Sequence, residues 1–153
     1  MKLPYSLVLV GLSAACSVAV YAASPAVTNA VRSRQANFKE IGGAFKSIND
    51  ELKTGAPDIN TVRPLARDLA NRTALLPRLF TKGSGVESGL RTRAKAEIWR
   101  DGATFARLQG DMITAARALD AAAASGNIAD LNVARARLGS TCKSCHDDFR
   151  ESS

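Results

Sequence analysis

Four long stretches of this chain repeat apolar residues every three or four positions, and this spacing constrains the fold more than any other feature. Such spacing gathers apolar side chains on one face of an α-helix. Alanine is abundant and aromatic residues make up only 5% of the chain, which favours helices over strands. A chain of 153 residues is long enough for one domain with its own core. We therefore expect an all-α fold, an antiparallel four-helix bundle.

Turn-forming residues between these stretches set the expected helix boundaries. Gly55 and Pro57 stop the first helix, and Asp58 can cap the second. Pro64 costs least if the regular part of the second helix begins near Thr61. Residues 76–93 contain three glycines and a proline, and are predicted to form a long loop that could close over a ligand. The four predicted helices cover residues 25–52, 59–76, about 95–124 and 128–149.

The first 22 residues are predicted to be a cleaved signal peptide. Lys2 supplies the positive start, an apolar run follows, and tolerated residues precede a cleavage site after Ala22. A retained membrane anchor is the alternative, although the apolar run is slightly short for a membrane span. The mature domain, residues 23–153, is then periplasmic without a stable membrane anchor. It keeps two cysteines, Cys142 and Cys145.

The formal net charge of +7 raises the question of an acidic partner such as nucleic acid. Lysine and arginine are, however, interleaved with aspartate and glutamate along the chain, and no basic tract contains interleaved aromatic residues. We therefore expect a solvated helical surface and no nucleic-acid binding.

The chemistry of the chain is concentrated in residues 142–146, Cys-Lys-Ser-Cys-His. On a helix, Cys142 and Cys145 face the same way one turn apart, and His146 follows four residues after Cys142. Two thiols at this spacing can add to the two vinyl groups of one haem edge, while the adjoining imidazole reaches the iron. The sequence therefore predicts one covalently attached haem c, held by two thioethers near the C-terminal helix, with His146 as the metal ligand.

Three other readings of this motif fit the sequence less well. A structural zinc site needs four ligands, and the mature chain has two cysteines and one histidine. A reactive dithiol normally sits at a helix N-terminus in an α/β fold, whereas this pair lies near a helix C-terminus. A disulfide between these cysteines would close a loop too small to stabilise the fold.

A haem motif at the C-terminus of a four-helix bundle resembles the class II c-type cytochromes, the cytochrome c prime family in particular. The likeness covers nearly the whole mature chain: Arg34-Gln35, Leu76-Pro77 with Phe80, Glu97-Ile98-Trp99 with Phe105, and the terminal Cys-x-x-Cys-His-x-x-x-Arg. The resemblance implies that Arg34 and Gln35 lie against the haem propionates. Arg150, one turn after His146, would cover the proximal face of the haem, with a solvated helix-end arginine as the alternative. Ala96 departs from the proline that relatives often carry there.

Phe38 is the most informative position of this comparison. Low-spin members of the class carry a methionine ligand four residues after the arginine, whereas this chain has Phe38 between Arg34 and Gly42. No second histidine exists, Met112 is explained as a core residue, and Lys39 lies off the apolar stripe. The resemblance therefore implies five-coordinate, high-spin iron with Phe38 packed over its open face.

An open axial position behind an apolar side chain suits small neutral gases. We expect a haem protein for electron transfer and binding of nitric oxide or carbon monoxide, with an unidentified redox partner. The alternatives are a purely low-spin electron carrier, a haem enzyme with peroxidase or nitric oxide reductase activity, and a haem-free helical interaction module. An enzyme is not expected, because no free distal base remains. Gly42, Gly43 and Ala44 allow close helix approach, and relatives commonly dimerise through the first two helices, so we expect a homodimer.

Overall fold

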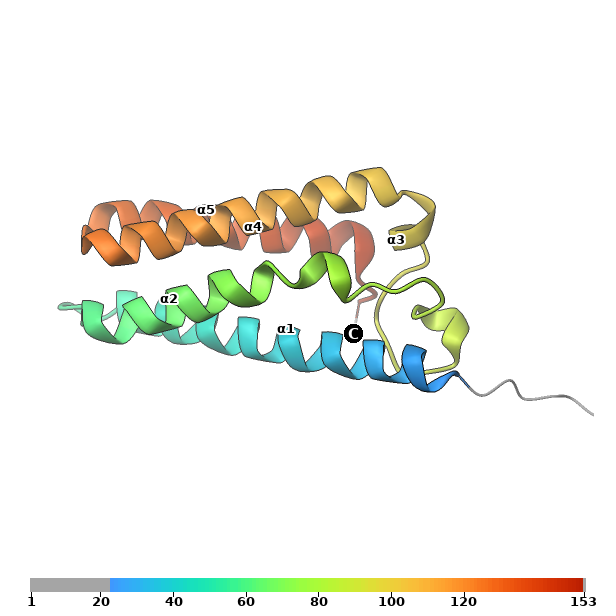
Figure 1. The fold of residues 1–153 in the computed structure, drawn as a ribbon. Coiled ribbons are helices and arrows are strands. Elements are labelled where there is room, and N and C mark those ends of the chain that lie inside the picture. Colours follow the sequence, from blue (N-terminus) through green and yellow to red (C-terminus); the bar gives the residue numbers. More distant parts are fainter. Residues whose placement is uncertain (1–22, 153) are drawn as a thin grey trace, which may run out of the picture.

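The computed structural model describes residues 23–152, and the signal-peptide prediction for residues 1–22 lies outside them. Four long helices make up most of this part of the chain (Figure 1). They are α1 (Pro25–Leu52), α2 (Ile59–Thr73), α4 (Gly102–Ser125) and α5 (Ile128–Phe149). Between α2 and α4 lie two 3₁₀ turns and one short helix: η1 (Leu76–Arg78), η2 (Val86–Ser88) and α3 (Glu97–Arg100).

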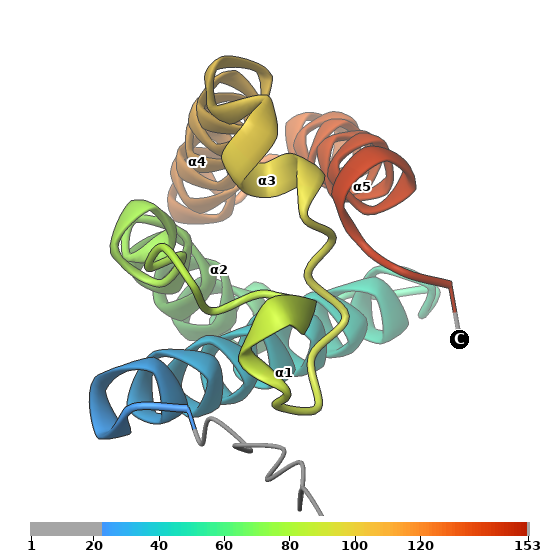
Figure 2. The ribbon, with the colours of Figure 1, turned by 90° about the vertical axis from the view of Figure 1, so that its right-hand side faces the viewer.

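The long helices form an antiparallel bundle around a common centre, which confirms the predicted fold class (Figure 2). Close helix–helix contacts join α1 to α2, α2 to α4 and α4 to α5. Side chains connect α1 with α5: Arg135 Nη1 donates to Asn49 Oδ1 at 2.8 Å. One turn further along α5, the Phe45 ring lies close to Gly139, where an added Cβ would be 3.4 Å from Cζ of that ring.

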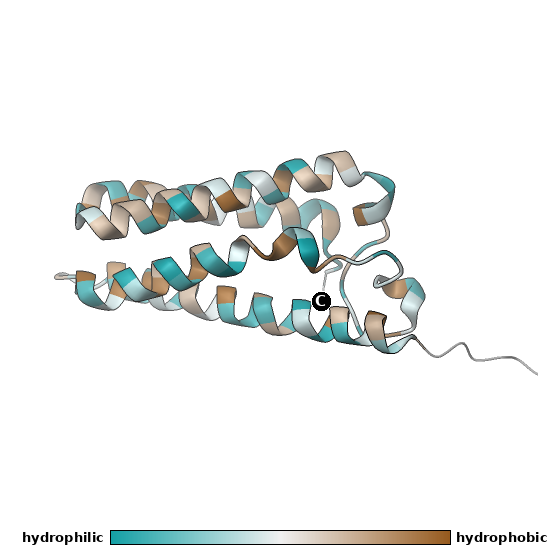
Figure 3. Cartoon of the chain, in the orientation of Figure 1, coloured by the Kyte–Doolittle hydropathy of each residue, from teal (hydrophilic) through white to brown (hydrophobic). Residues whose placement is uncertain are grey.

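Apolar side chains from all four long helices form the core. Figure 3 shows hydrophobic and hydrophilic residues recurring along each of them. The larger of two buried clusters includes Leu69, Leu119 and Leu138, which are at most 1% exposed. Each leucine buried in this way stabilises the fold by about 1.5–3 kcal/mol. The smaller cluster consists of Ala94, Ile98, Phe105, Leu108 and Phe149.

Polar side chains begin the helices where the sequence predicts a start. Asp58 accepts a hydrogen bond from the Asn60 amide at 2.9 Å and so caps α2. Asn127 caps α5 in the same way, after Gly126 has ended α4 with a φ of 76° that favours glycine. None of the helices formed by residues 23–152 is long and apolar enough to cross a membrane.

Three predicted boundaries are wrong. The helix expected over about 95–124 is interrupted at Asp101, whose backbone is not helical and whose carboxylate caps α4 by accepting from the Thr104 amide. The regular part of α2 begins at Ile59 instead of near Thr61, because Asp58 already caps the helix there, and Pro64 lies inside it. The same helix ends at Thr73, so Leu76 belongs to the turn η1.

Candidate functional site

The cysteine motif lies in the last two turns of α5. Both thiols are free and half-buried. Cys142 packs against the larger core cluster and Cys145 against the smaller one, so the motif lies where the two clusters meet. The two sulfur atoms therefore face apolar surroundings on one side of the helix, as the spacing predicts.

Burial alters the acidity of both thiols. It raises the pKa of Cys142, and it raises the pKa of Cys145 to about 11, with smaller contributions from Cys142 and Asp148. Both groups therefore stay protonated at neutral pH. A reactive dithiol needs the opposite, a lowered thiol pKa, so the redox interpretation of the motif is disfavoured.

His146 presents a neutral imidazole at the C-terminal end of α5. Partial burial lowers its pKa, and the positive charges of Arg150 and Arg93 act in the same direction, while Asp147 opposes them. Arg150 Nη1 lies 3.4 Å from His146 Nδ1. A neutral imidazole is the form that binds iron.

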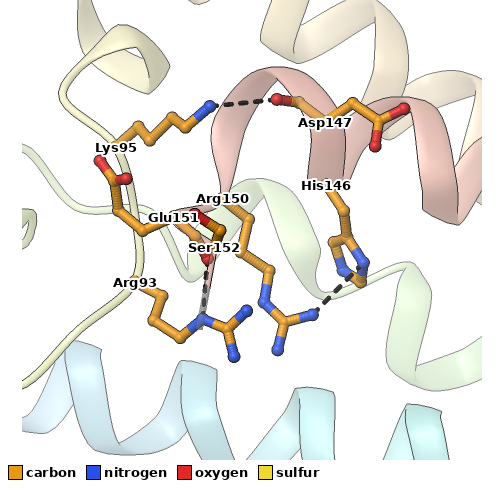
Figure 4. Close-up of a pocket in the computed structure, with 7 residues that line it drawn as sticks. All are labelled: Arg93, Lys95, His146, Asp147, Arg150, Glu151 and Ser152. Carbon is orange, nitrogen blue, oxygen red and sulfur yellow. Dashed lines mark hydrogen bonds between the residues drawn. The ribbon is translucent and has the colours of Figure 1, made fainter.

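A pocket of about 450 Å³ opens beside this imidazole (Figure 4). Basic side chains from two parts of the chain line it: Arg93 and Lys95 from the segment before α3, and Arg150 from the end of α5. Asp147, Glu151 and Ser152 also line it. The pocket is therefore polar and open, in contrast to the apolar surroundings of the two thiols.

Phe38 on α1 is half-buried and packs against the larger core cluster. Its ring meets Phe80 edge-on at a centroid distance of 6.1 Å. From there, T-shaped contacts continue through Phe105 to Phe149, at 4.7 Å and 5.1 Å. A row of aromatic rings thus runs from α1 across the bundle to the end of α5, as a wall suited to a flat apolar group.

The residues present fit a c-type haem. Two free thiols one turn apart, a neutral imidazole beside them and an aromatic wall supply attachment, ligation and apolar contact. Within residues 23–152, no group of three or more His, Cys, Asp or Glu side chains could hold a metal ion on its own. The zinc interpretation therefore lacks a ligand set in the described part of the chain.

The structure places Arg34 and Gln35 against the loop between α2 and α4. Arg34 is only 4% exposed, and both its terminal nitrogens bond to residues of that loop. Gln35 is exposed, and its Nε2 donates to the Arg91 carbonyl at 2.7 Å. Their predicted contact with haem propionates stays a prediction. Sequence reasoning missed the partners Ser84 and Thr92, because nothing in the sequence links them to α1.

Five further positions bear on the predicted ligands and dimer. Met112 is 5% exposed and belongs to the larger core cluster, which supports its interpretation as a packing residue. Lys39 is exposed. Gly42 and Gly43 are exposed on α1 with open space around them, whereas Ala44 is buried in the core.

Comparisons with known proteins agree with this geometry. Residues 29–150 match the protein family described as Cytochrome C'. A cytochrome c' of Rhodopseudomonas palustris is 37% identical over 129 residues, which cover 82% of this chain and 84% of that protein. The crystal structure of cytochrome c' from Thermochromatium tepidum superimposes with a TM-score of 0.77 at 28% identity, covering 82% of this chain and 97% of that one. The nitric oxide complex of a mutant cytochrome c prime from Alcaligenes xylosoxidans gives 0.75 at 28% identity, covering 83% and 97%.

Proposed function

Because the chain belongs to the cytochrome c prime family, we propose that it is a periplasmic haem protein with five-coordinate, high-spin iron that transfers electrons and binds nitric oxide. Membership of this family means one covalently attached c-type haem and a role as an electron carrier and gas binder, not as an enzyme. The bound haem supplies a redox-active iron.

His146 is the sole protein ligand in this proposal. It is the only histidine in the chain. Met112 is packed in the core cluster and Lys39 is exposed to solvent, so we assign neither residue to the iron. Cys142 and Cys145 hold the haem by its edge, and the lowered pKa of His146 keeps its imidazole ready for the metal.

The observation that carries the proposal is Phe38. It stands four residues after Arg34, at the position where low-spin members of the class carry a methionine ligand. A phenyl ring cannot bind iron. Its half-buried ring in the aromatic row offers no hydrogen bond to bound water or anions. A small neutral molecule can enter only where the ring moves aside. Relatives from Alcaligenes xylosoxidans with bound nitric oxide support this choice of ligand.

We assign Arg150 to the proximal face, since its guanidinium lies beside the imidazole of His146. Export to the periplasm rests on the predicted signal peptide, and N-terminal sequencing of the mature protein after Ala22 would test it. A homodimer is proposed through the exposed Gly42 and Gly43, where a partner helix can approach closely.

Phe38→Met tests the assignment of the open position. A thioether at this position can close the sixth coordination site, so the oxidised variant should change from a high-spin to a low-spin absorption spectrum. Phe45→Met is the matched control: Phe45 is also half-buried on α1 against the same cluster, but lies opposite Gly139. The proposal fails if the unmodified protein is already low-spin, or if both variants give the same spectrum.

A further inference from the structure

Arg34 is the only buried charged side chain in the part of the chain that the structure describes. Burial lowers the pKa of its guanidinium, and the charge of Glu87 acts in the opposite direction. A buried charge is costly unless hydrogen bonds satisfy it. The position of Arg34 in the apolar stripe of α1 therefore needs an explanation from its partners.

Every hydrogen bond of Arg34 goes to the loop between α2 and α4. Nη1 donates to Ser84 Oγ at 2.8 Å and to the Leu79 carbonyl at 3.3 Å. Nη2 donates to the Ser84 carbonyl at 2.7 Å and to Thr92 Oγ1 at 2.9 Å. The guanidinium also lies over the Phe80 ring, 4.9 Å from its centroid. The four N–H groups of the two terminal nitrogens are thus all used within the protein.

The conformation of the loop depends on hydrogen bonds from outside it, such as those of Arg34. Before α3 begins at Glu97, its regular structure is limited to two turns of three residues each, η1 and η2. Ser84, which is fully buried, donates its hydroxyl to the Thr81 carbonyl at 2.6 Å and so presents its oxygen to Arg34. Arg34 therefore holds two separate parts of the loop, residues 79–84 and Thr92, at one point on α1.

Thr92 begins a segment that pairs with the residues at the C-terminal end of α5. We call residues 92–95 the strap. Thr92 Oγ1 accepts from the Ala94 amide at 3.2 Å, and Ala94 forms an antiparallel bridge with Arg150. The Lys95 amide donates to the Phe149 carbonyl at 3.1 Å, and the Glu151 amide donates to the Arg93 carbonyl at 2.9 Å.

The strap also caps the last turn of α5. Lys95 Nζ donates to the carbonyls of Asp147 and Asp148, at 3.0 Å and 3.3 Å. The last carbonyls of a helix have no partner within it, and a cation near them is favourable. His146 lies in this turn, so the strap holds the part of the helix that carries the imidazole.

We propose that Arg34 is a positioning residue that fixes the strap through Thr92 and thereby holds the His146 turn of α5 in place. Arg34 lies on a different helix from His146. It acts through a series of contacts that runs from Arg34 to Thr92, from Thr92 to Ala94 and from Ala94 to Arg150. Only the effect on the iron rests on the proposed function, because the mechanical link concerns the protein alone.

Amide hydrogen exchange of the haem-loaded protein tests this link. Arg34→Lys keeps the charge, but one ammonium group cannot reproduce the forked contacts with Ser84 and Thr92. Thr92→Val removes only the accepting hydroxyl and leaves α1 intact. Both variants should speed exchange at the Lys95, Arg150 and Glu151 amides by about tenfold or more. Exchange in the middle of α4 should stay unchanged, because none of the hydrogen bonds described for Arg34 or the strap involves that helix.

The control and a second readout separate positioning from other roles. Arg32→Lys changes an exposed arginine on the same helix and should leave strap exchange unaltered. The double variant Arg34→Lys with Thr92→Val should exchange no faster than Arg34→Lys alone, because the two residues act in one chain. Electron paramagnetic resonance of both single variants should show a broadened spread of iron environments.

Unchanged exchange at the strap in Arg34→Lys would overturn the proposal. Changed iron spectra without faster strap exchange would also overturn it, because Arg34 would then act on the haem directly. The exchange result does not depend on the coordination number of the iron, so failure of the proposed function and failure of this link can be told apart.

Discussion

Removing the Phe38 ring should speed the binding of carbon monoxide to the reduced protein. In the proposed arrangement, a ligand reaches the iron only by pushing this ring aside. The displacement gives up the edge contact with Phe80, which is about 0.5–1.5 kcal/mol, and part of the burial of the ring. Together these terms amount to about 1.5–3 kcal/mol, and since each 1.4 kcal/mol is a factor of ten, Phe38→Ala should bind about 10 to 100 times faster.

The same substitution should destabilise the fold moderately. Phe→Ala at a fully buried site costs about 3–5 kcal/mol, and Phe38 is only half-buried. A loss of about half that amount, roughly 1.5–2.5 kcal/mol, is expected from denaturant unfolding. This loss is small enough for a small domain to remain folded during the kinetic measurement.

Stopped-flow mixing of the reduced protein with carbon monoxide measures the rate. Phe45→Ala is the control, because it should lose similar stability while leaving the rate unchanged. If Phe38→Ala binds at the rate of the unmodified protein, the ring is not the gate. Equal acceleration in Phe38→Ala and Phe45→Ala would show that general loosening of the bundle, not the ring, controls entry.

Other substitutions test the fold and the attachment. Asp101→Ala removes the cap of α4 and should lower the unfolding free energy by about 0.5–2 kcal/mol. Gly110→Ala, at an exposed position inside α4 with open space around it, should raise that free energy by roughly 0.5–1 kcal/mol. Gly43→Glu should shift the proposed dimer towards monomer in sedimentation experiments, while Gly110→Glu should not. Cys142→Ser or Cys145→Ser should sharply reduce the haem that stays bound through acid–acetone extraction, as measured by intact mass.

Much of the fold could be predicted because each long helix carries its own signals. Apolar spacing, the cap at Asp58 and the break between the last two long helices are local features, and all appear where the sequence places them. The break at Asp101 was missed because apolar spacing continues across it, although Asp followed by Gly102 is itself a start signal for a helix.

The motif at the end of α5 was equally local, since the spacing of Cys142, Cys145 and His146 fixes their shared face. The partners of Arg34 were not predictable. Ser84 and Thr92 lie 50 and 58 residues further along the chain, in a loop without periodicity. Only the packing of that loop against α1 brings them together, and this contact depends on the whole bundle.

Electron paramagnetic resonance of the oxidised, haem-loaded protein tests the central claim most directly. The claim is that His146 is the only protein ligand to the iron and that Phe38 leaves the opposite position open. This arrangement predicts a high-spin or mixed-spin signal. A purely low-spin signal with the character of two histidines, or of histidine and methionine, would contradict it and reveal a second protein ligand.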